Sequence, residues 1–261
     1  MKIMDKPLFS IITVCYNAAD TIGRTLESVA AQTFQNYEHI IVDGASKDAT
    51  ADIIASTPGA SRRKFRSEPD HGLYDAMNKG LGMACGTYLV FLNAGDKFHG
   101  TDALDRLAAA AQTAAGDGMK PGILYGQTDI VDDSGTYLRP RHLRAPENLT
   151  LADFGRGMLV CHQAFVPLRR IAPLYDTDYR FSADYEWCIR CLQHSRKNVL
   201  VDGTLVDYLD GGLTTANHRA SLKERYRIMC YYYGTVPTIL RHIGFIFRAL
   251  RRKITKQTSQ E

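Results

Sequence analysis

The sequence predicts an α/β fold in which a mostly parallel sheet carries helices on both faces. Runs of strand-forming residues alternate with segments of helical spacing, and the order over the first hundred residues is βαβαβαβ. Most of the runs are continuously apolar, which is typical of parallel strands buried on both faces. Of the 261 residues, 45% are hydrophobic and 23% are charged. This composition excludes a disordered, fibrous or polytopic membrane chain.

Each predicted element rests on a local pattern. Strand-forming runs predict strands at residues 8–16, 38–42, 64–67 and 87–92. Helical spacing predicts helices at residues 21–33, 48–56 and 74–84. Asp48 is expected to cap the second of these helices, and Thr101 is expected to cap an alanine-rich helix over residues 102–115. In the second half we expect a strand at 122–127, a hairpin at 130–138, a helix at 181–194 and a strand at 199–208.

Four polar residues follow the ends of predicted strands. They are Asn17, Asp43, Asp70 and Asp96. Ligands of open α/β sheets bind beyond the carboxyl ends of the strands, so this edge is the predicted binding site. One such residue alone would be read as a turn or cap residue, because Asp and Asn favour turns. Four on one edge favour a site.

Several other site classes are not supported. The sequence has no GxxxxGK[ST] loop, and Gly80-Leu81-Gly82 does not follow the first strand, which counts against a Walker-type ATPase and a dinucleotide-binding fold. Cys188 and Cys191 form a lone CxxC inside a predicted helix. A structural zinc site would need a second pair, so we expect ordinary, reduced cysteines here.

Two long segments resemble a known family. Residues 7–50, PLFSIITVCYNAADTIGRTLESVAAQTFQNYEHIIVDGASKDAT, are similar to the opening of the family 2 glycosyltransferases, which have the GT-A fold. Residues 67–96, SEPDHGLYDAMNKGLGMACGTYLVFLNAGD, resemble the second half of their nucleotide-sugar domain. The resemblance is strongest to bacterial enzymes that build exopolysaccharide and lipopolysaccharide glycans. It implies inverting transfer of a sugar from a nucleotide-diphosphate donor to a glycan or lipid-linked acceptor. Alternatives are a nucleotidyltransferase and a sugar-nucleotide-binding module without catalysis.

The resemblance also implies which residues bind the donor. Tyr16 would offer an aromatic face to the base, and Asp43 would accept hydrogen bonds from the base or the ribose. Many family members carry an arginine where this chain has Met77, and Lys79 would take over a phosphate contact. The full set of expected nucleotide-sugar-binding residues is Thr13, Cys15, Tyr16, Asn17, Asp43, Asp70, Tyr74, Asn78, Lys79 and Asn93.

The metal and the general base are assigned in the same way. Asn93-Ala94-Gly95-Asp96 takes the place of the family's Asp-x-Asp element, so Asp96 is the expected ligand of a divalent cation, Mg²⁺ or Mn²⁺. Asn93 replaces the first aspartate, which lowers the expected metal affinity. His218 is the second expected metal ligand, in a loop that would close over the donor phosphates. Asp184, at the start of a helix, is the expected general base.

Other polar residues leave two interpretations open. Arg139, Arg141, His142 and Arg144 either contact an anionic acceptor or are solvated loop residues. His162 either touches a substrate or is a core histidine. Trp187 is more consistent with the core than with a sugar-stacking position.

The resemblance and the composition divide the chain into three parts. Residues 1–100 form the nucleotide-sugar-binding half of the GT-A domain, 101–220 its acceptor-side half, and 221–261 a helical, basic tail. The tail holds six Lys/Arg and one Glu after Leu240. As a helix it would carry an apolar stripe on one side and arginines on the opposite side. The stripe is Val236, Leu240, Ile243, Phe247, Leu250 and Ile254.

The tail also bears on partners and localisation. The stripe favours an anionic membrane surface as a partner, whereas packing on the domain or on a second subunit is the alternative. The N-terminus lacks the pattern of a secretory signal, so we expect a cytoplasmic protein, peripheral on the inner face of the membrane. No nucleic acid partner is expected, because the chain lacks an RNA-binding motif and interleaved aromatic residues.

Overall fold

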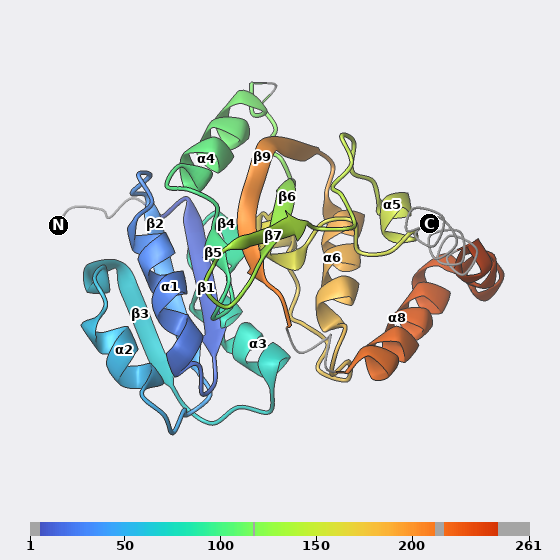
Figure 1. Cartoon of the computed structure of the whole chain (residues 1–261). Helices are drawn as coiled ribbons and strands as arrows, with labels where there is room; N and C mark the ends of the chain where they lie inside the picture. Colours follow the sequence, from blue (N-terminus) through green and yellow to red (C-terminus); the bar gives the residue numbers. More distant parts are fainter. Residues whose placement is uncertain (1–5, 117, 212–216, 245–261) are drawn as a thin grey trace, which may run out of the picture.

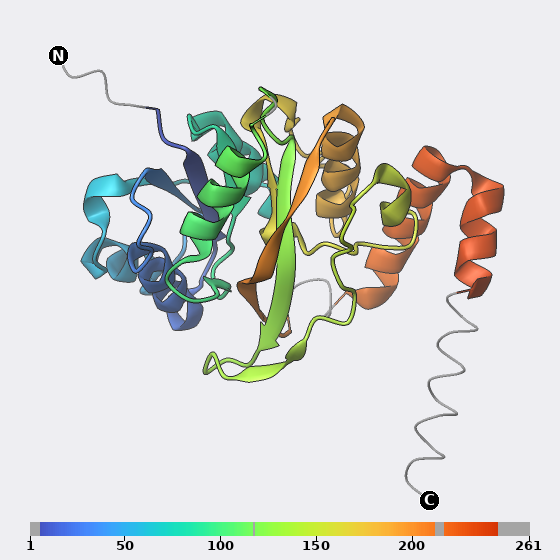
Figure 2. The same cartoon turned by 90° about the horizontal axis from the view of Figure 1, so that it is seen from above.

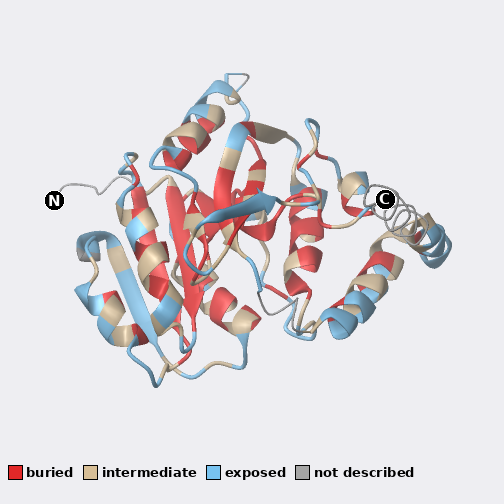
Figure 3. Cartoon of the chain, in the orientation of Figure 1, coloured by how far each residue is buried: buried red, intermediate tan, exposed pale blue. Residues whose placement is uncertain are grey.

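The computed structural model describes residues 6–116, 118–211 and 217–244. Two sheets lie side by side, helices cover their outer faces, and the C-terminal helices stand at one end (Figure 1). The buried residues concentrate in the strands of residues 9–15, 37–43 and 88–91 and in the helix of residues 183–194, whereas the edge strand of residues 63–67 is largely exposed (Figure 3). The predicted α/β fold with helices on both faces is confirmed.

The first sheet is entirely parallel and has the strand order β3-β2-β1-β4. Its strands are β1 Phe9–Cys15, β2 Tyr37–Asp43, β3 Arg63–Ser67 and β4 Tyr88–Phe91. Helices α1 Ala19–Ala30 and α2 Thr50–Ser56 cover one face, where Ile22 and Ile54 pack with Ile41. Helix α3 Leu73–Met83 covers the other face, where Met77 packs with Ile12 and Ile40.

The second sheet has the order β5-β9-β6-β7, and β8 pairs with β6. Its strands are β5 Lys97–Phe98, β6 Ile123–Val131, β7 Tyr137–Pro140, β8 Phe165–Pro167 and β9 Asn198–Leu209. β6 and β9 are parallel, and the other pairs are antiparallel. Figure 2 shows β6 and β9 between helix α4 Ala103–Thr113 and helix α6 Ala183–His194. The two sheets share one core, in which Phe91 of β4 packs in a cluster with Tyr125 of β6 and Trp187 of α6.

The remaining elements are short, apart from α8. They are helix α5 Leu151–Phe154, the 3-10 turns Ala60–Arg62, His162–Ala164 and Arg169–Ile171, and helix α8 His218–Tyr233. Residues 235–244 are again helical. Within the described ranges, none of the helices combines the length and the apolar character that crossing a membrane requires.

Three local predictions need correction. Residues 122–127 and the first arm of the predicted hairpin form one strand, β6, because its full length pairs with β9. Thr101 does not cap α4: the cap position is Asp102, and the Thr101 carbonyl accepts a hydrogen bond from Thr33. The predicted loop around His218 is already the start of α8.

Candidate functional site

The carboxyl edge of the first sheet brings polar side chains from three strands into one row. Strand register places Cys15 opposite Asp43, and Asp43 opposite Ser67. The Ser67 hydroxyl donates to Asp43 Oδ2 at 2.7 Å, and the Cys15 thiol lies 3.7 Å from Asp43 Oδ1. Burial and the Asp43 charge raise the pKa of the Cys15 thiol, so it acts as a neutral packing group here.

Asp43 organises the loop that follows β2. Its side chain is fully buried, and the Ser46 backbone N–H donates to Oδ2 at 3.0 Å while the Ser46 hydroxyl donates to Oδ1. Both carboxylate oxygens are therefore engaged with donors, as a buried charge requires. Asp43 therefore fixes the shape of the loop that follows β2.

The loops after β1 and β2 hold one another. Asn17 adopts a left-handed backbone with φ of 47°, and its N–H donates to Ser46 Oγ at 2.8 Å. Its side-chain Oδ1 accepts the Lys47 N–H at 2.9 Å. Beside Asn17, the Tyr16 ring is 61% exposed. An exposed aromatic ring on a rigid loop can stack with a nucleobase.

The Asp70 side chain lies against Gly44, in the loop that follows β2. A Cβ at Gly44 would lie 2.5 Å from Asp70 Oδ2 and 3.2 Å from Tyr16 Cδ2, so any larger residue there would displace the Asp70 side chain. Asp70 Oδ1 accepts the Gly72 N–H at 2.8 Å, directly before α3. Tyr16, Asp43 and Asp70 are thus brought together. Thr13 lies deeper: its buried hydroxyl is 2.9 Å from His39 Nε2 and faces no open space.

Asn78 and Lys79 are tied into the fold. Asn78 clamps the Tyr175 backbone, donating to its carbonyl at 3.0 Å and accepting its N–H at 2.7 Å. The Lys79 ammonium donates to the Pro69 carbonyl at 2.7 Å and pairs with Glu68 at 3.1 Å. Lys79 therefore holds the segment before Asp70, and Asn78 holds the segment around Tyr175. The polar groups of both side chains are engaged in this structure.

Asp96 lies at the junction of the two sheets, where it is 4% exposed. Gln163 Nε2 donates to its Oδ2 at 2.8 Å, and the Leu209 N–H donates to Oδ1 at 3.0 Å. Burial raises the pKa of Asp96 from 3.8 to about 7 despite these two bonds. The side-chain Oδ1 of neighbouring Asn93 is buried and has no hydrogen-bond partner.

These two residues fit a divalent cation. A buried carboxylate whose only hydrogen bonds in the described structure come from neutral donors gains from a nearby positive charge. The carbonyl oxygen of Asn93 is the kind of neutral oxygen ligand that Mg²⁺ and Mn²⁺ accept, and at present nothing described satisfies it. Asp96 and Asn93 would hold the ion.

Asp184 lies in the first turn of α6 and is partly exposed. Tyr74 donates to its Oδ1 at 3.2 Å, and the Tyr185 N–H donates to the same oxygen at 2.8 Å. Burial, followed by the Asp184 charge, raises the pKa of Tyr74 well above its usual value, so the phenol keeps its proton and donates. No described residue donates to Oδ2, which remains able to accept a proton.

Behind Asp184 lies an aromatic cluster that belongs to the core. Tyr175 stacks on Trp187 with centroids 4.8 Å apart, and its hydroxyl is 2.6 Å from His162 Nε2. Burial lowers the pKa of His162 to about 4, so it is a neutral core histidine rather than a substrate contact. Trp187 is fully buried and donates to the Pro173 carbonyl, which confirms its core placement.

The remaining predicted contacts are exposed, bound to other protein groups or outside the described residues. His218 is exposed at the start of α8, and most of the loop expected to close over the phosphates, 212–216, lies outside the described residues. Arg141 is neither solvated nor free for an acceptor, since it donates to the Leu143, Met158 and Leu159 carbonyls. Arg139 pairs with Asp210 at the surface. His142 and Arg144 are exposed.

Sequence reasoning missed three residues of the site. Ser46 and Ser67 complete the Asp43 network, and Gln163 orients Asp96. Ser67 could have been found from the parallel register of the strands, because it ends β3 as Asp43 ends β2. Nothing local marks Gln163, whose bond to Asp96 joins residues 67 positions apart.

Comparisons with known proteins identify the family of the chain. Residues 10–172 match the model of glycosyl transferase family 2. A PGL/p-HBAD biosynthesis glycosyltransferase of Mycobacterium bovis is 34% identical over 197 residues, 73% of this chain and 72% of its own. The amylovoran biosynthesis glycosyltransferase AmsB of Erwinia amylovora is 30% identical over 209 residues, 77% and 69% of the two chains.

A solved structure extends the likeness to the fold. The structure of TarS 1–349 from S. aureus in complex with UDP-GlcNAc has a TM-score of 0.69 with this chain at 16% identity, covering 91% of this chain and 73% of that one. At this identity the likeness concerns the fold, which is of the predicted GT-A type. From the family match and the relatives together, the chain belongs to glycosyl transferase family 2 and is a glycosyltransferase.

Proposed function

We propose that this glycosyltransferase moves a sugar, with inversion, from a nucleotide-diphosphate donor to a hydroxyl of a glycan or lipid-linked acceptor in cell-surface polysaccharide synthesis. The observation that carries the proposal is the contact of Asp184 with Tyr74. Tyr74 lies in the first turn of α3, directly after the segment in which Asp70 touches Gly44. One short stretch of chain therefore links the nucleoside pocket to a partly exposed carboxylate.

The chain's own residues account for binding and proton transfer. Tyr16 stacks on the base, and the loop fixed by Asp43 and Asp70 holds the nucleoside. Asp184 Oδ2 takes the proton of the acceptor hydroxyl as that oxygen forms its bond to the anomeric carbon. The bond from the anomeric carbon to the phosphate oxygen breaks, and the nucleoside diphosphate leaves. A divalent cation held by Asp96 and Asn93 would stabilise negative charge on this leaving group.

Donor binding tests the nucleoside pocket directly. Calorimetry with UDP-, GDP- and dTDP-sugars, with Mn²⁺ or EDTA, is expected to show binding of at least one donor. Tyr16→Ala should weaken that binding by about 5–150-fold, because stacking on a base is worth about 1–3 kcal/mol. Tyr137→Ala is the matched control, since this tyrosine of β7 is 57% exposed. Unchanged binding in Tyr16→Ala, or no donor bound by the wild type, would contradict the pocket assignment.

Membrane attachment of the C-terminal part is proposed as well. On the helix of residues 235–244, Val236, Leu240 and Ile243 are 68%, 64% and 45% exposed. The opposite side holds the helix on the protein, with Thr238 buried and Arg241 over the Tyr233 ring at 5.0 Å. An exposed apolar stripe on an anchored helix supports binding to a lipid surface. The rest of the predicted stripe, Phe247, Leu250 and Ile254, lies outside the described residues.

Co-sedimentation with vesicles distinguishes lipid binding from packing. The double variant Val236→Ser, Leu240→Ser is expected to lose binding to anionic vesicles while keeping the wild-type melting temperature. Leu174→Ser, which changes a leucine that is 62% exposed elsewhere on the molecule, should bind vesicles normally. If the double variant sediments with vesicles like the wild type, the stripe does not contact lipid.

A further inference from the structure

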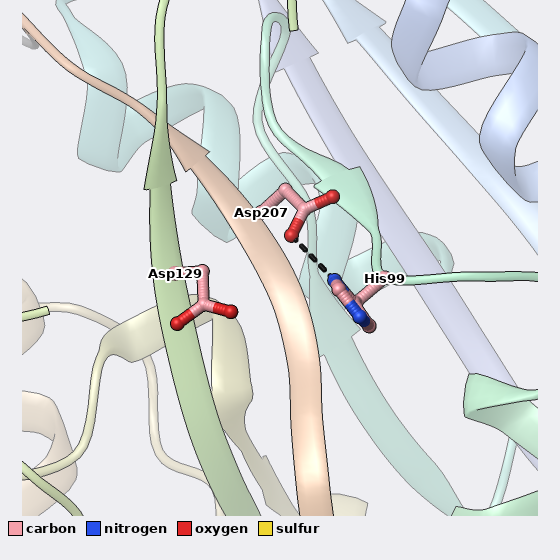
Figure 4. A group of neighbouring side chains, drawn as sticks. All are labelled: His99, Asp129 and Asp207. Carbon is pink, nitrogen blue, oxygen red and sulfur yellow. Dashed lines mark hydrogen bonds and ion pairs between the residues drawn. The ribbon is translucent and has the colours of Figure 1, made fainter. Parts of the chain in front are cut away.

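We propose that His99, Asp129 and Asp207 form a binding site for a divalent transition-metal ion such as Zn²⁺, separate from the site of Asp96. Figure 4 shows the three side chains, which come from β6, from β9 and from the residue that follows β5. One nitrogen or oxygen atom from each lies within 4.8 Å of the others. One imidazole with two carboxylates is a ligand set that suits Zn²⁺ and its neighbours in the first transition row.

The backbone fixes the positions of these ligands. Strand register places Lys97 opposite Asp207 and Asp207 opposite Asp129, so a single row crosses β5, β9 and β6. His99 follows Lys97 by two residues, and its N–H donates to the Leu205 carbonyl at 2.9 Å. Because successive side chains alternate between the faces of a sheet, Lys97 and His99 share one face. The three ligands thus stand on a rigid surface.

Each carboxylate has one oxygen anchored and one oriented toward the others. Lys97 Nζ lies 3.4 Å from Asp207 Oδ2, whereas Asp207 Oδ1 accepts from His99 Nδ1 at 2.8 Å. The Thr204 hydroxyl donates to Asp129 Oδ2 at 3.0 Å. Lys97 and Thr204 are therefore outer partners that hold the carboxylates in place, a role that such partners have around bound metals. A metal ion could replace the proton between His99 and Asp207 without breaking either anchor.

The place of this site in the second sheet indicates what a bound ion would do for the segment that carries Asp96. Asp96 and Phe98 lie on the opposite face of this segment from Lys97 and His99. An ion here would join β5 to β9 and β6. These strands carry the groups around Asp96, because β5 directly follows it and Leu209 of β9 donates to it. The ion would brace the segment that presents Asp96 and would not itself contact a donor.

Metal binding without catalysis tests the site. Zn²⁺ is titrated calorimetrically into the full-length chain carrying Asp96→Asn, which removes the other metal ligand, and Cys85→Ser, which removes an exposed thiol. We expect one binding event and a rise in melting temperature, because an ion that binds only the folded state stabilises it. Adding Thr204→Val should weaken binding by about 10–100-fold, the usual effect of losing an outer partner. Adding His99→Ala should weaken it more.

His194→Ala in the same background is the control, since this histidine is also exposed but lies at the end of α6. It should bind Zn²⁺ like the parent. The proposal is overturned if the parent shows no Zn²⁺ binding, or if His99→Ala and His194→Ala bind Zn²⁺ equally well. Loss of donor binding by Tyr16→Ala is independent of this result, so failure of the proposed function and failure of the zinc site can be told apart.

Discussion

Asp43 and Asp96 are both buried aspartates at the ends of strands, yet their surroundings differ. Both oxygens of Asp43 accept hydrogen bonds from serines that lie on the neighbouring strand and in the adjoining loop. Among the described residues, Asp96 accepts hydrogen bonds only from the Gln163 amide and one backbone N–H, and burial raises its pKa to about 7. The carboxylate of Asp43 at the edge of the first sheet is therefore stabilised by its hydrogen bonds. The carboxylate of Asp96 at the junction of the sheets is destabilised by its burial.

This difference suggests separate roles for the two regions in donor binding and in the transfer reaction. A satisfied network such as that of Asp43 holds its loop in one shape before a ligand arrives, which reduces the entropy lost on binding. A buried carboxylate such as Asp96, whose described hydrogen bonds come only from neutral donors, is stabilised by a nearby positive charge. The proposed base Asp184 is also open to a new partner, since no described residue donates to its Oδ2. We expect changes at the first region to affect affinity and changes at the second to affect turnover.

The largest expected effect is on turnover. Asp184→Asn should lower kcat by about 10²–10⁴-fold, the usual contribution of a general base, while donor affinity stays near that of the wild type. The measurement is steady-state transfer together with calorimetry of the donor. Asp178→Asn, an exposed acid that precedes α6, is the control and should leave both quantities unchanged. Near wild-type turnover in a folded Asp184→Asn protein would remove this residue from the mechanism.

The second effect is on the pH dependence of stability. The folded-state pKa of Asp96 is raised from 3.8 to about 7, so the folded protein binds more protons than the unfolded chain between these values. Without metal, Asp96 therefore lowers the free energy of unfolding as pH rises from 4 to 7. Asp96→Asn should remove this loss and be more stable than the wild type at pH 8 by about 2–4 kcal/mol, at 1.36 kcal/mol per pKa unit.

Denaturant unfolding in EDTA at pH 4 and pH 8 measures this difference. At pH 4 the gain from Asp96→Asn should largely vanish, because the wild-type carboxyl is then protonated. Mn²⁺ at pH 8 should stabilise the wild type more than the variant, because the variant lacks the Asp96 carboxylate. A stability difference between variant and wild type that is the same at both pH values would mean that Asp96 is not strained by its burial.

The contrast between the two regions also explains what the sequence could predict. The strands β1 to β4 and the helices between them were predicted because each is a local pattern, and the parallel order aligned Asn17, Asp43 and Asp70 at one edge. Asp184 was assigned from the resemblance of its segment to the family, and it does lie in the first turn of α6. The assignments of these residues to donor binding and to catalysis remain predictions until they are measured.

What the sequence did not predict depends on distant partners. The Asp96 environment comes from Gln163 and Leu209, which are 67 and 113 residues away along the chain. The continuous strand β6 exists because β9 pairs beside it. Arg141 was expected to contact solvent or an acceptor, but carbonyls brought together by folding surround it. Long-range pairing has no signature in a local window, so burial at the junction could not be foreseen.

The smallest expected effect comes from changing Tyr74, which links the region of Asp70 to Asp184. Tyr74 belongs to α3, which follows the Asp70 segment, and its hydroxyl donates to Asp184 at 3.2 Å. In Tyr74→Phe the carboxylate loses one donor and becomes easier to protonate. The acidic limb of the kcat/KM profile should therefore move to higher pH. The fall in kcat at neutral pH should be about 10–160-fold, because a single hydrogen bond to a charged group is worth about 1.5–3 kcal/mol.

A purely structural role for Tyr74 would give a different result. Its ring is 6% exposed and stacks with Tyr175 at 5.7 Å, and phenylalanine preserves that packing. Loss of stability with an unmoved pH profile would therefore mean that the hydroxyl serves the fold rather than the base. Tyr231→Phe, at a tyrosine that is 79% exposed on α8, should change neither stability nor profile. If Tyr74→Phe shifts the profile and leaves the KM for the donor unchanged, Tyr74 positions the base and does not bind the nucleotide sugar, and the predicted donor set must lose this residue.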